Sequence, residues 1–246
     1  MKLISLNVWG GALNVPLLEF LEKNSGVDFF LFQEMHHNAT PKTNWNNRGN
    51  SNLFEDVAKM LPHHDGYFAP IQDDEYGLAG FISKTAPLIE HGDVFVHRHK
   101  NAMNENDATN LGRNLQYFKI GDKKPYTLIN FHGLWTGRDK RDTEERIKQS
   151  QRIIEFTKTV TDEFILAGDF NLMPDTQSIK LLETIGVRNL ITEYGITNTR
   201  TSYYKKTSDK FADYTFVTPG IDVRDFRIMP EEVSDHAAMY LEFYLT

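Results

Sequence analysis

Short apolar runs alternate with longer amphipathic segments along this chain. The runs have the length of β-strands and are rich in Ile, Phe, Val and Tyr, and many of them are bounded by Gly, Pro or Asp. This pattern predicts strands at 2–9, 27–34, 66–71, 77–83, 111–120, 125–132, 163–168, 213–218 and 239–245.

Three segments have the spacing of amphipathic helices. Asn14 is expected to cap a helix that has a proline in its first turn and a stripe of leucines on one face. Thr143 is expected to cap a helix over 144–160, and Thr176 a helix over 177–185, because apolar residues recur at helical spacing after each of them.

Two polar stretches, at 36–51 and 99–110, are too long for simple turns. Loops of this length in a compact domain often carry function. No linker, internal repeat or low-complexity tract divides the sequence, so we expect one domain over 1–246. A chain of this size buries roughly 70 % of the surface of its unfolded state, which is enough for a substantial core.

The composition argues against several classes of protein. A hydrophobic content of 40 % and a charged content of 25 % are ordinary for a globular protein. The net charge of −7 means that the surface as a whole is not a nucleic-acid footprint, although a few basic residues suffice for a local polyanion site. No apolar segment reaches the ~18 residues that span a bilayer, and no leader-like segment begins the sequence. We therefore expect a cytoplasmic monomer without stable membrane insertion.

The chain contains no cysteine, and this restricts its metal chemistry. Disulfides and thiolate zinc sites are excluded. Any metal must be held by oxygen and imidazole ligands, which favour Mg²⁺, Mn²⁺ or Ca²⁺ over softer metals.

Short polar islands at the ends of the apolar runs are the most informative feature. An isolated buried carboxylate costs several kcal/mol or is neutralised by a shift of its pKa, so a series of such islands needs a common cause. The simplest cause is that the strand ends converge on one site, where the acids share a metal ion and the histidines face a phosphate. The islands are SLNVW at 5–9, FQEM at 32–35, NFHG at 130–133, AGDFN at 167–171, ADYTF at 212–216 and SDHAA at 234–238.

Together these islands resemble the motifs of the endonuclease/exonuclease/phosphatase superfamily of metal-dependent phosphohydrolases. The most specific are GDFN at 168–171 and SDH at 234–236, with QE at 33–34 far upstream. Each is weak alone, but together they occur in the family order. The resemblance covers nearly the whole chain and implies an α/β fold, a four-layer sandwich of two packed mixed β-sheets flanked by helices, with the site among the loops at one end.

The resemblance implies a site for Mg²⁺ or Mn²⁺. Glu34 matches the main metal ligand of the family, although its residue type alone would also suit a surface position at a strand end. Asn7 ends the first predicted strand and would join the metal and phosphate network. Asp235 would contact the metal directly or through water.

The GDFN motif supplies two catalytic candidates, Asp169 and Asn171. In extended backbone, residues two positions apart point to the same side, so both side chains can reach one small volume. A turn-forming D-x-N is the alternative interpretation. The resemblance implies that Asp169 orients or deprotonates the attacking water and that Asn171 holds this water and a phosphate oxygen.

Two histidines complete the predicted machinery. The resemblance implies that His236 donates a hydrogen bond to the phosphate oxygen that gains charge in the transition state, and that Asp213 forms a hydrogen-bonded dyad that keeps it cationic. His132 would stabilise the transition state or the leaving group, although a lone histidine is more often structural.

One residue departs from the pattern of the DNA-cleaving relatives. They carry N-x-D where this chain has N-V-W, and Trp9 cannot ligate a cation as the aspartate can. The N-x-W pattern is similar to that of sphingomyelinase-type members.

The candidates for substrate binding are basic and aromatic. Arg113 begins a predicted strand after a long polar loop and could clamp a phosphate or form a surface ion pair. The segment 138–146 has no net charge and suits the solvated start of a helix, but Arg138, Lys140 or Arg141 could still reach the pocket.

The loop after the QE motif holds further candidates for a substrate wall. His36, His37 and Trp45 lie there and could stack on a base or sugar, although exposed loop aromatics often have no such role.

We therefore predict a divalent-metal-dependent phosphohydrolase that cleaves a small or non-duplex phosphoester by in-line attack of activated water. A DNA endonuclease or exonuclease of the same superfamily is the alternative, and the net charge and the missing N-x-D argue against it. A sphingomyelinase-like lipid phosphodiesterase fits Trp9, but we find no export signal or apolar hairpin. A non-catalytic binding module would be expected to have lost the catalytic residues that are present here.

Overall fold

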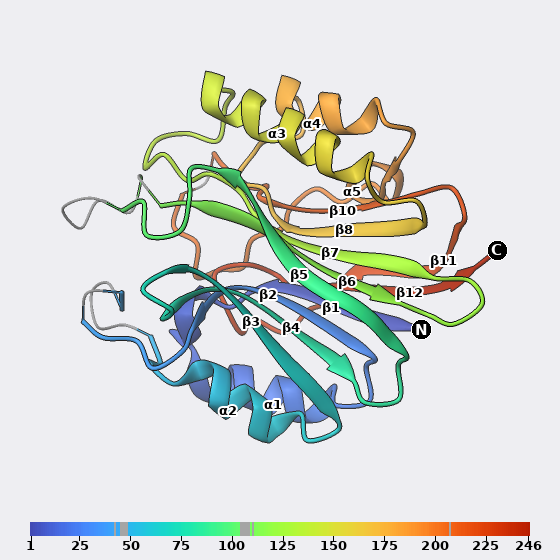
Figure 1. The fold of residues 1–246 in the computed structure, drawn as a ribbon. Helices are drawn as coiled ribbons and strands as arrows, with labels where there is room; N and C mark the ends of the chain where they lie inside the picture. Colours follow the sequence, from blue (N-terminus) through green and yellow to red (C-terminus); the bar gives the residue numbers. More distant parts are fainter. Residues whose placement is uncertain (42, 45–48, 104–108, 110, 207) are drawn as a thin grey trace.

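Two six-stranded mixed β-sheets form the centre of the computed structural model, which describes residues 1–41, 43–44, 49–103, 109, 111–206 and 208–246 (Figure 1). The first sheet has the strand order β11-β12-β1-β2-β4-β3, and the second has the order β5-β6-β7-β8-β10-β9. The strands are β1 (Lys2–Asn7), β2 (Phe29–His36), β3 (His64–Gln72), β4 (Tyr76–Ser83), β5 (Leu88–His97), β6 (Arg113–Ile120), β7 (Tyr126–His132), β8 (Glu163–Asp169), β9 (Arg188–Asn189), β10 (Asp213–Val217), β11 (Ile221–Ile228) and β12 (Met239–Leu245).

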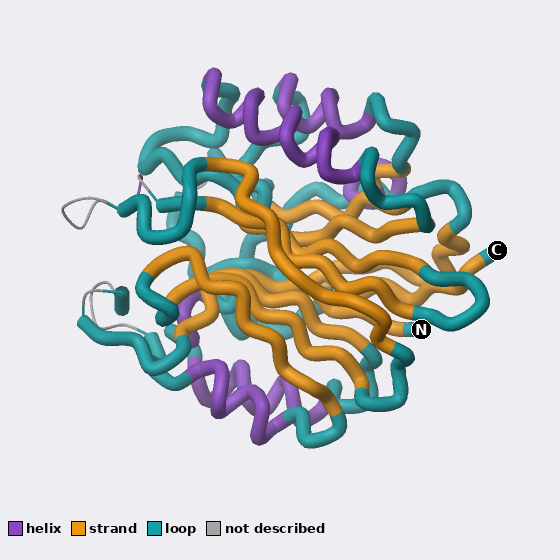
Figure 2. Tube along the Cα trace, viewed as in Figure 1, coloured by secondary structure: helices purple, strands orange, loops and turns teal. Residues whose placement is uncertain are grey.

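The helices lie on the outer faces of the two sheets, as Figure 2 shows. The first sheet is covered by α1 (Asn14–Lys23) and α2 (Leu53–Met60), and the second by α3 (Glu144–Thr157), α4 (Gln177–Glu183) and the short α5 (Leu190–Glu193). A single 3₁₀ turn, Trp9–Gly11, follows β1. The predicted four-layer sandwich is therefore confirmed. No helix in the described part of the chain combines the length and the hydrophobicity needed to cross a bilayer.

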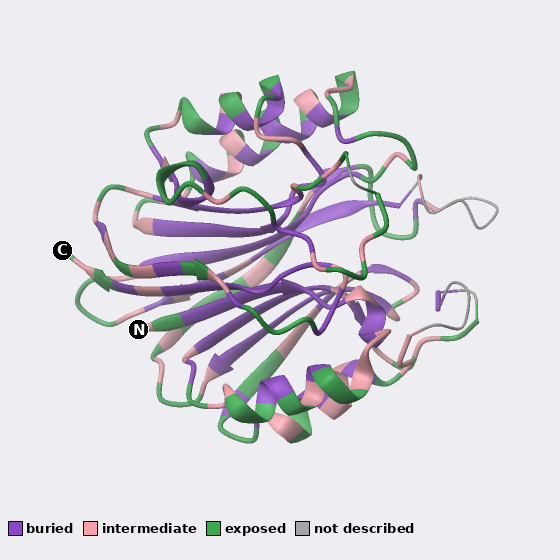
Figure 3. Ribbon diagram, turned by 180° about the vertical axis from the view of Figure 1, so that it is seen from behind, coloured by how far each residue is buried: buried purple, intermediate pink, exposed green. Residues whose placement is uncertain are grey.

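The unbroken apolar runs of the central strands follow from burial on both faces. Successive side chains of a strand point to opposite faces of the sheet. In β1, Leu3 packs in the core between the sheets, whereas its neighbour Ile4 packs with the residues under α1 and α2. In β2, Leu31 and Phe30 divide in the same way. Figure 3 shows the resulting distribution, with buried strands and with exposed residues on the outer faces of the helices.

A fully buried amide network connects the two sheets beneath the cavity. Gln33 Nε2 of β2 donates a hydrogen bond to Asn130 Oδ1 of β7 at 2.7 Å. Asn130 Nδ2 in turn donates to the Phe32 carbonyl at 3.0 Å and to Gln116 Oε1 at 3.2 Å. Because an unpaired buried amide would cost free energy, these bonds favour one alignment of the sheets.

The sequence pattern located nine of the twelve strands. It missed β5 and β11, which lie at sheet edges and have many exposed positions, so charged residues interrupt their apolar pattern. It also missed β9, which has only two residues.

The helix predictions were partly correct. The Thr143 and Thr176 side chains accept hydrogen bonds from the backbone N–H groups of Arg146 and Ile179, as N-caps do. The Asn14 cap was wrong, because Asn14 is the first residue of α1 and its Oδ1 accepts a hydrogen bond from Asn50 instead. The helices α2 and α5 were not predicted from the sequence.

Candidate functional site

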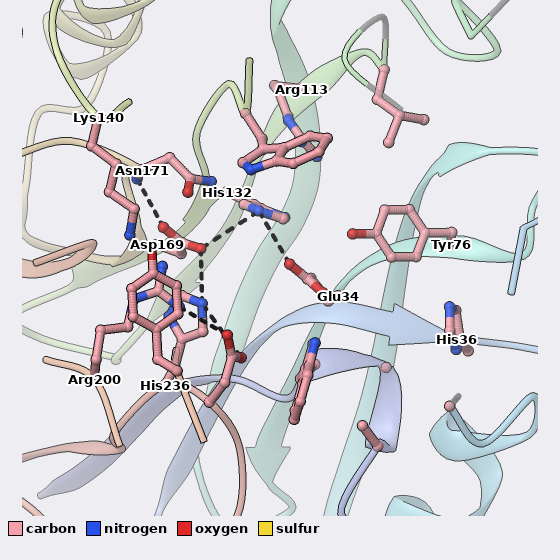
Figure 4. Close-up of a pocket in the computed structure, with 18 of the residues that line it drawn as sticks. Glu34, His36, Tyr76, Arg113, His132, Lys140, Asp169, Asn171, Arg200 and His236 are labelled. Carbon is pink, nitrogen blue, oxygen red and sulfur yellow. Dashed lines mark hydrogen bonds and ion pairs between the residues drawn. The ribbon is translucent and has the colours of Figure 1, made fainter. Parts of the chain in front are cut away.

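A cavity of about 440 Å³ opens among the loops at one end of the sandwich (Figure 4). This is the end at which β1, β7 and β8 terminate, and the chain termini lie at the other end (Figure 1). The cavity is lined by Trp9, Gly10, Ala12, Glu34, His36, Asn44, Gly49, Tyr76, Leu111, Arg113, His132, Trp135, Lys140, Asp169, Asn171, Arg200, Tyr204, Lys206, Asp235 and His236.

Four polar side chains from the two sheets meet at the bottom of the cavity, and we call Asn7, Glu34, His132 and Asp169 the carboxylate floor. Asn7 Nδ2 donates hydrogen bonds to Glu34 Oε1 and to Asp169 Oδ2, both at 2.9 Å. His132 Nε2 lies 3.8 Å from Glu34 Oε1 and 3.6 Å from Asp169 Oδ2. The predicted convergence of these strand ends is therefore present, and Figure 4 shows Glu34, His132 and Asp169 pointing toward one another.

Glu34 reaches the floor through an irregularity in β2. The pairing of β2 with β4 shifts register between Phe32 and Met35, and Glu34 has a φ of 57°, in the left-handed region. Such a bulge re-aims a side chain at a small cost in backbone free energy. Burial raises the pKa of the Glu34 carboxyl, and Asp235 and Asp169 raise it further, against the lowering effect of the Asn7 hydrogen bond.

Asp169 and Asn171 converge, but not through the extended backbone that we expected. Asn171 lies beyond the end of β8 with a φ of 54°, so the chain turns between the two residues. The Asn171 backbone N–H donates to Asp169 Oδ1 at 2.8 Å, and its Nδ2 lies 3.4 Å from the Gly133 carbonyl. The two interpretations of this motif are therefore both correct. The motif forms a D-x-N turn, and the turn brings both side chains to the cavity.

The predicted dyad between His236 and Asp213 is present. His236 Nδ1 lies 2.8 Å from Asp213 Oδ1, and both side chains are buried. Burial lowers the pKa of His236 and Arg200 lowers it further, but Asp213 and the neighbouring carboxylates outweigh them and raise it above its usual value. His236 Nε2 faces the floor, 3.5 Å from Asp169 Oδ2.

The two histidines of the site differ in electrostatics. Burial and the positive charge of Arg113 lower the pKa of His132 well below its usual value, although Asp169 opposes them. His236 therefore favours the cation, and His132 the neutral imidazole. Burial raises the pKa of Asp169, but the cationic His236 and the positive charges of Arg200 and Lys140 outweigh it and lower this pKa, so the carboxyl stays ionised.

The donor set of the floor fits a hard divalent cation. Glu34, His132 and Asp169 each place one ligand atom within 4.8 Å of the others. Asp235 Oδ1, at the cavity wall, is buried without a hydrogen-bond partner, so its negative charge is only partly compensated. Clustered carboxylates that raise the pKa of Glu34 would be relieved by a cation, and oxygen donors of this kind suit Mg²⁺ or Mn²⁺.

Three buried basic side chains surround the floor on one side, and we call Arg113, Lys140 and Arg200 the cationic arc (Figure 4). Arg200 was missed by the sequence analysis, because it lies in an irregular polar segment without a motif or periodicity. Tyr204, from the same segment, lies against it, with its ring centroid 4.2 Å from the Arg200 guanidinium carbon.

The remaining predicted substrate residues have mixed outcomes. Arg138 and Arg141 do not line the cavity, because both are exposed and Arg141 forms a two-bond ion pair with Asp175. His36 lies in the cavity wall against Gly10, where an added Cβ would come within 2.7 Å of the imidazole ring.

The last two predicted substrate residues are aromatic. His37 lies outside the cavity, with Nε2 2.7 Å from Glu55 Oε1. Trp45 lies outside the described residues.

Comparisons with known proteins agree with this geometry. Residues 4–236 match the model of the endonuclease/exonuclease/phosphatase family. The structure of the endonuclease/exonuclease/phosphatase from Bacteroides vulgatus aligns with a TM-score of 0.76 at 18 % identity, covering 100 % of this chain and 98 % of that one. The Bacteroides thetaiotaomicron mannosyl-6-phosphatase aligns with a TM-score of 0.73 at 17 % identity, covering 100 % of both chains.

A further solved structure has the same fold. The human nocturnin catalytic domain with bound sulfate anion aligns with a TM-score of 0.68 at 16 % identity, covering 100 % of this chain and 93 % of that one. At these identities the likeness establishes the fold alone. A search of curated proteins found no significant match.

Proposed function

Because the chain belongs to the endonuclease/exonuclease/phosphatase family, we propose that it is a Mg²⁺- or Mn²⁺-dependent hydrolase of a compact phosphoester. The observation that carries this proposal is the convergence of Glu34, Asp169 and His236 from distant parts of the chain on one cavity. Each group has a hydrogen-bonded support, and their spacing suits a phosphoryl group and its attacking water.

Glu34 would hold the metal, with Asn7 and Asp235 beside it. When bound, the metal would neutralise negative charge on the phosphate. Asp169 is ionised and buried, so it can accept a hydrogen bond from the attacking water and orient it in line with the leaving group. Asn171, held against Asp169 by its backbone N–H, is placed to position this water and a phosphate oxygen.

The two histidines would share the charge that develops in the transition state. Cationic His236, fixed by Asp213, can donate from Nε2 to a phosphate oxygen. Neutral His132 can donate to a second oxygen or to the leaving group without adding a charge. Fixed donors in a buried site stabilise charge more effectively than donors exposed to water.

Several observations support a compact substrate. The catalytic groups lie at the bottom of a cavity of about 440 Å³, and the chain has a net charge of −7. A similar fold serves a mannosyl-6-phosphatase, which by its name acts on a small phosphoester. Duplex DNA would need a basic surface, because affinity for it depends on neutralised phosphates.

Purified protein can be tested with Mg²⁺ or Mn²⁺ against a hexose phosphate, single-stranded DNA, sphingomyelin and an abasic duplex. We expect metal-dependent hydrolysis of the small ester and no specific nicking of the duplex. Efficient incision of the duplex, lost in Asp169→Ala, would instead establish the nuclease alternative.

The metal assignment has its own test. Calorimetric titration of Mg²⁺ should show affinity at least about tenfold weaker for Glu34→Ala than for wild type. Glu19→Ala, on the exposed face of α1, is the matched control and should bind as wild type does. Equal affinities in Glu34→Ala and wild type would refute this assignment.

A further inference from the structure

The cationic arc is not needed for the hydrolytic steps above, yet all three of its side chains are buried. Arg113 is 2 % exposed, Lys140 4 % and Arg200 8 %. Buried Lys and Arg side chains are rare unless they are paired, because removing a charge from water is costly. The pairing that each of them has in this structure is incomplete.

Arg113 is the least compensated member. It begins β6, and its Nε and Nη1 are buried without a hydrogen-bond partner. The positive charge of Arg113 helps to lower the pKa of the neighbouring His132, and its side chain contacts Tyr76. A guanidinium presents donors in a planar fork that matches two oxygens of a phosphate. Because Arg113 also lines the cavity, its incompletely paired guanidinium points to an anion that binds there.

Arg200 and Lys140 each donate one hydrogen bond, but among the described residues other N–H groups of both side chains have no hydrogen-bond partner. Arg200 Nη1 donates to Asp235 Oδ2 at 3.2 Å, whereas its Nε is buried without a partner. Lys140 Nζ donates to the Phe211 carbonyl at 2.9 Å, which leaves two of its three N–H groups. Burial and the charge of Arg200 lower the pKa of Lys140 to about 8, so it remains largely protonated at neutral pH.

The balance of charges around the cavity also favours an anionic ligand. Among the described residues, three carboxylates and four basic side chains line it, and the His236 cation is offset by Asp213. A divalent cation on the floor would leave a formal surplus of three positive charges. The carboxylates are Glu34, Asp169 and Asp235, and the basic residues are Arg113, Lys140, Arg200 and Lys206.

We propose that the cationic arc selects a terminal phosphoryl group, so that the substrate is a dianionic phosphomonoester rather than a phosphodiester. This inference rests on the function proposed above. A terminal phosphoryl group has two negative charges and three non-ester oxygens for the three cations. A diester has one charge and two such oxygens, and its second ester group would leave a buried N–H of the arc unpaired.

The test uses two esters with the same leaving group, 4-nitrophenyl phosphate and methyl 4-nitrophenyl phosphate, with Mg²⁺ at pH 7.5. For wild type we expect kcat/KM for the monoester to exceed that for the diester by about 100-fold or more. Arg113→Gln and Arg200→Gln should each lower this ratio at least about tenfold. Arg224→Gln, in the exposed part of β11, is the matched control and should keep the ratio.

Binding separates this inference from the proposed function. Calorimetry with inorganic phosphate and dimethyl phosphate should show at least about tenfold tighter binding of the phosphate, and Arg113→Gln should remove most of that difference. Arg113→Lys, which keeps the charge, tests whether a loss reflects recognition or misfolding. Equal kcat/KM for the two esters, or equal affinity for the two anions, overturns the inference while hydrolysis of either ester leaves the proposed function standing. Failure to hydrolyse any phosphoester, with tight phosphate binding retained, overturns the proposed function instead.

Discussion

The carboxylate floor and the cationic arc are built differently, although they face the same cavity. The floor stands on β1, β2, β7 and β8, strands in the interior of the two sheets. Apart from Arg113 at the start of β6, the arc is carried by irregular segments, with Lys140 before α3 and Arg200 before β10. In the function and the substrate selection proposed above, the chemistry rests on rigid strands and the selection mainly on loops, which tolerate change more readily.

The largest expected effect comes from the floor. Asp169→Asn keeps the size of the side chain but removes the charge that we propose to orient the attacking water, so kcat should fall by roughly a thousandfold or more. Steady-state kinetics on the small ester measure this loss, and circular dichroism checks the fold. Because the arc is untouched, affinity for inorganic phosphate should change little by comparison. A loss of less than tenfold in kcat would contradict the role given to Asp169.

An intermediate effect is expected from the dyad, which acts behind the floor. Asp213 raises the pKa of His236, so Asp213→Asn should lower this pKa and reduce turnover about 10- to 100-fold. Below the lowered pKa the variant histidine is still cationic. Between the lowered and the original value it is neutral in the variant alone, so the relative loss should grow as pH rises through that window.

An NMR titration of His236 and a pH–rate profile test this prediction together. A histidine titration that is identical in Asp213→Asn and wild type would exclude the electrostatic pairing, even if turnover fell.

The smallest effect concerns the support of the arc. Arg146 is fully buried and donates hydrogen bonds to the carbonyls of Leu134, Asp139 and Arg141, which fixes the loop that carries Lys140. Arg146→Lys cannot make all of these bonds, so we expect a loss of about 2 kcal/mol in the free energy of unfolding. Phosphate affinity should fall about three- to tenfold because Lys140 is less well positioned.

Urea unfolding and calorimetry measure the two quantities separately. Arg141→Lys is the control, because its ion pair with Asp175 lies on the surface, and it should change neither. Unchanged phosphate affinity in a destabilised Arg146→Lys would show that the loop does not position the arc.

The same division explains how much of the molecule could be predicted from its sequence. Floor residues such as Asn7, Glu34 and His132 interrupt or end apolar runs, and a polar residue at such a position is a visible signal. The convergence of these runs could therefore be predicted from the residues. The sandwich and the hydrogen bond between His236 and Asp213 could be predicted only through the resemblance of the motifs to the family.

Arg200 gave no comparable signal, because nothing in an irregular segment distinguishes a buried arginine from an exposed one. Arg138, Lys140 and Arg141 were indistinguishable in the sequence for the same reason, and only Lys140 lines the cavity. Backbone geometry was equally hidden. The positive φ values of Glu34 and Asn171 depend on tertiary contacts that stabilise them against their local preference.

The pairing of β12 with β1 has a consequence for the order in which this protein matures on the ribosome. Strand β12 lies antiparallel to β1, between β1 and β11, and Asp235 and His236 lie shortly before its first residue, Met239. A nascent chain that has emerged only through β10 already carries Asn7, Glu34 and Asp169, but β1 still lacks one of its two neighbours. The site should therefore remain incomplete, and activity absent, until β12 has been synthesised and has inserted beside β1.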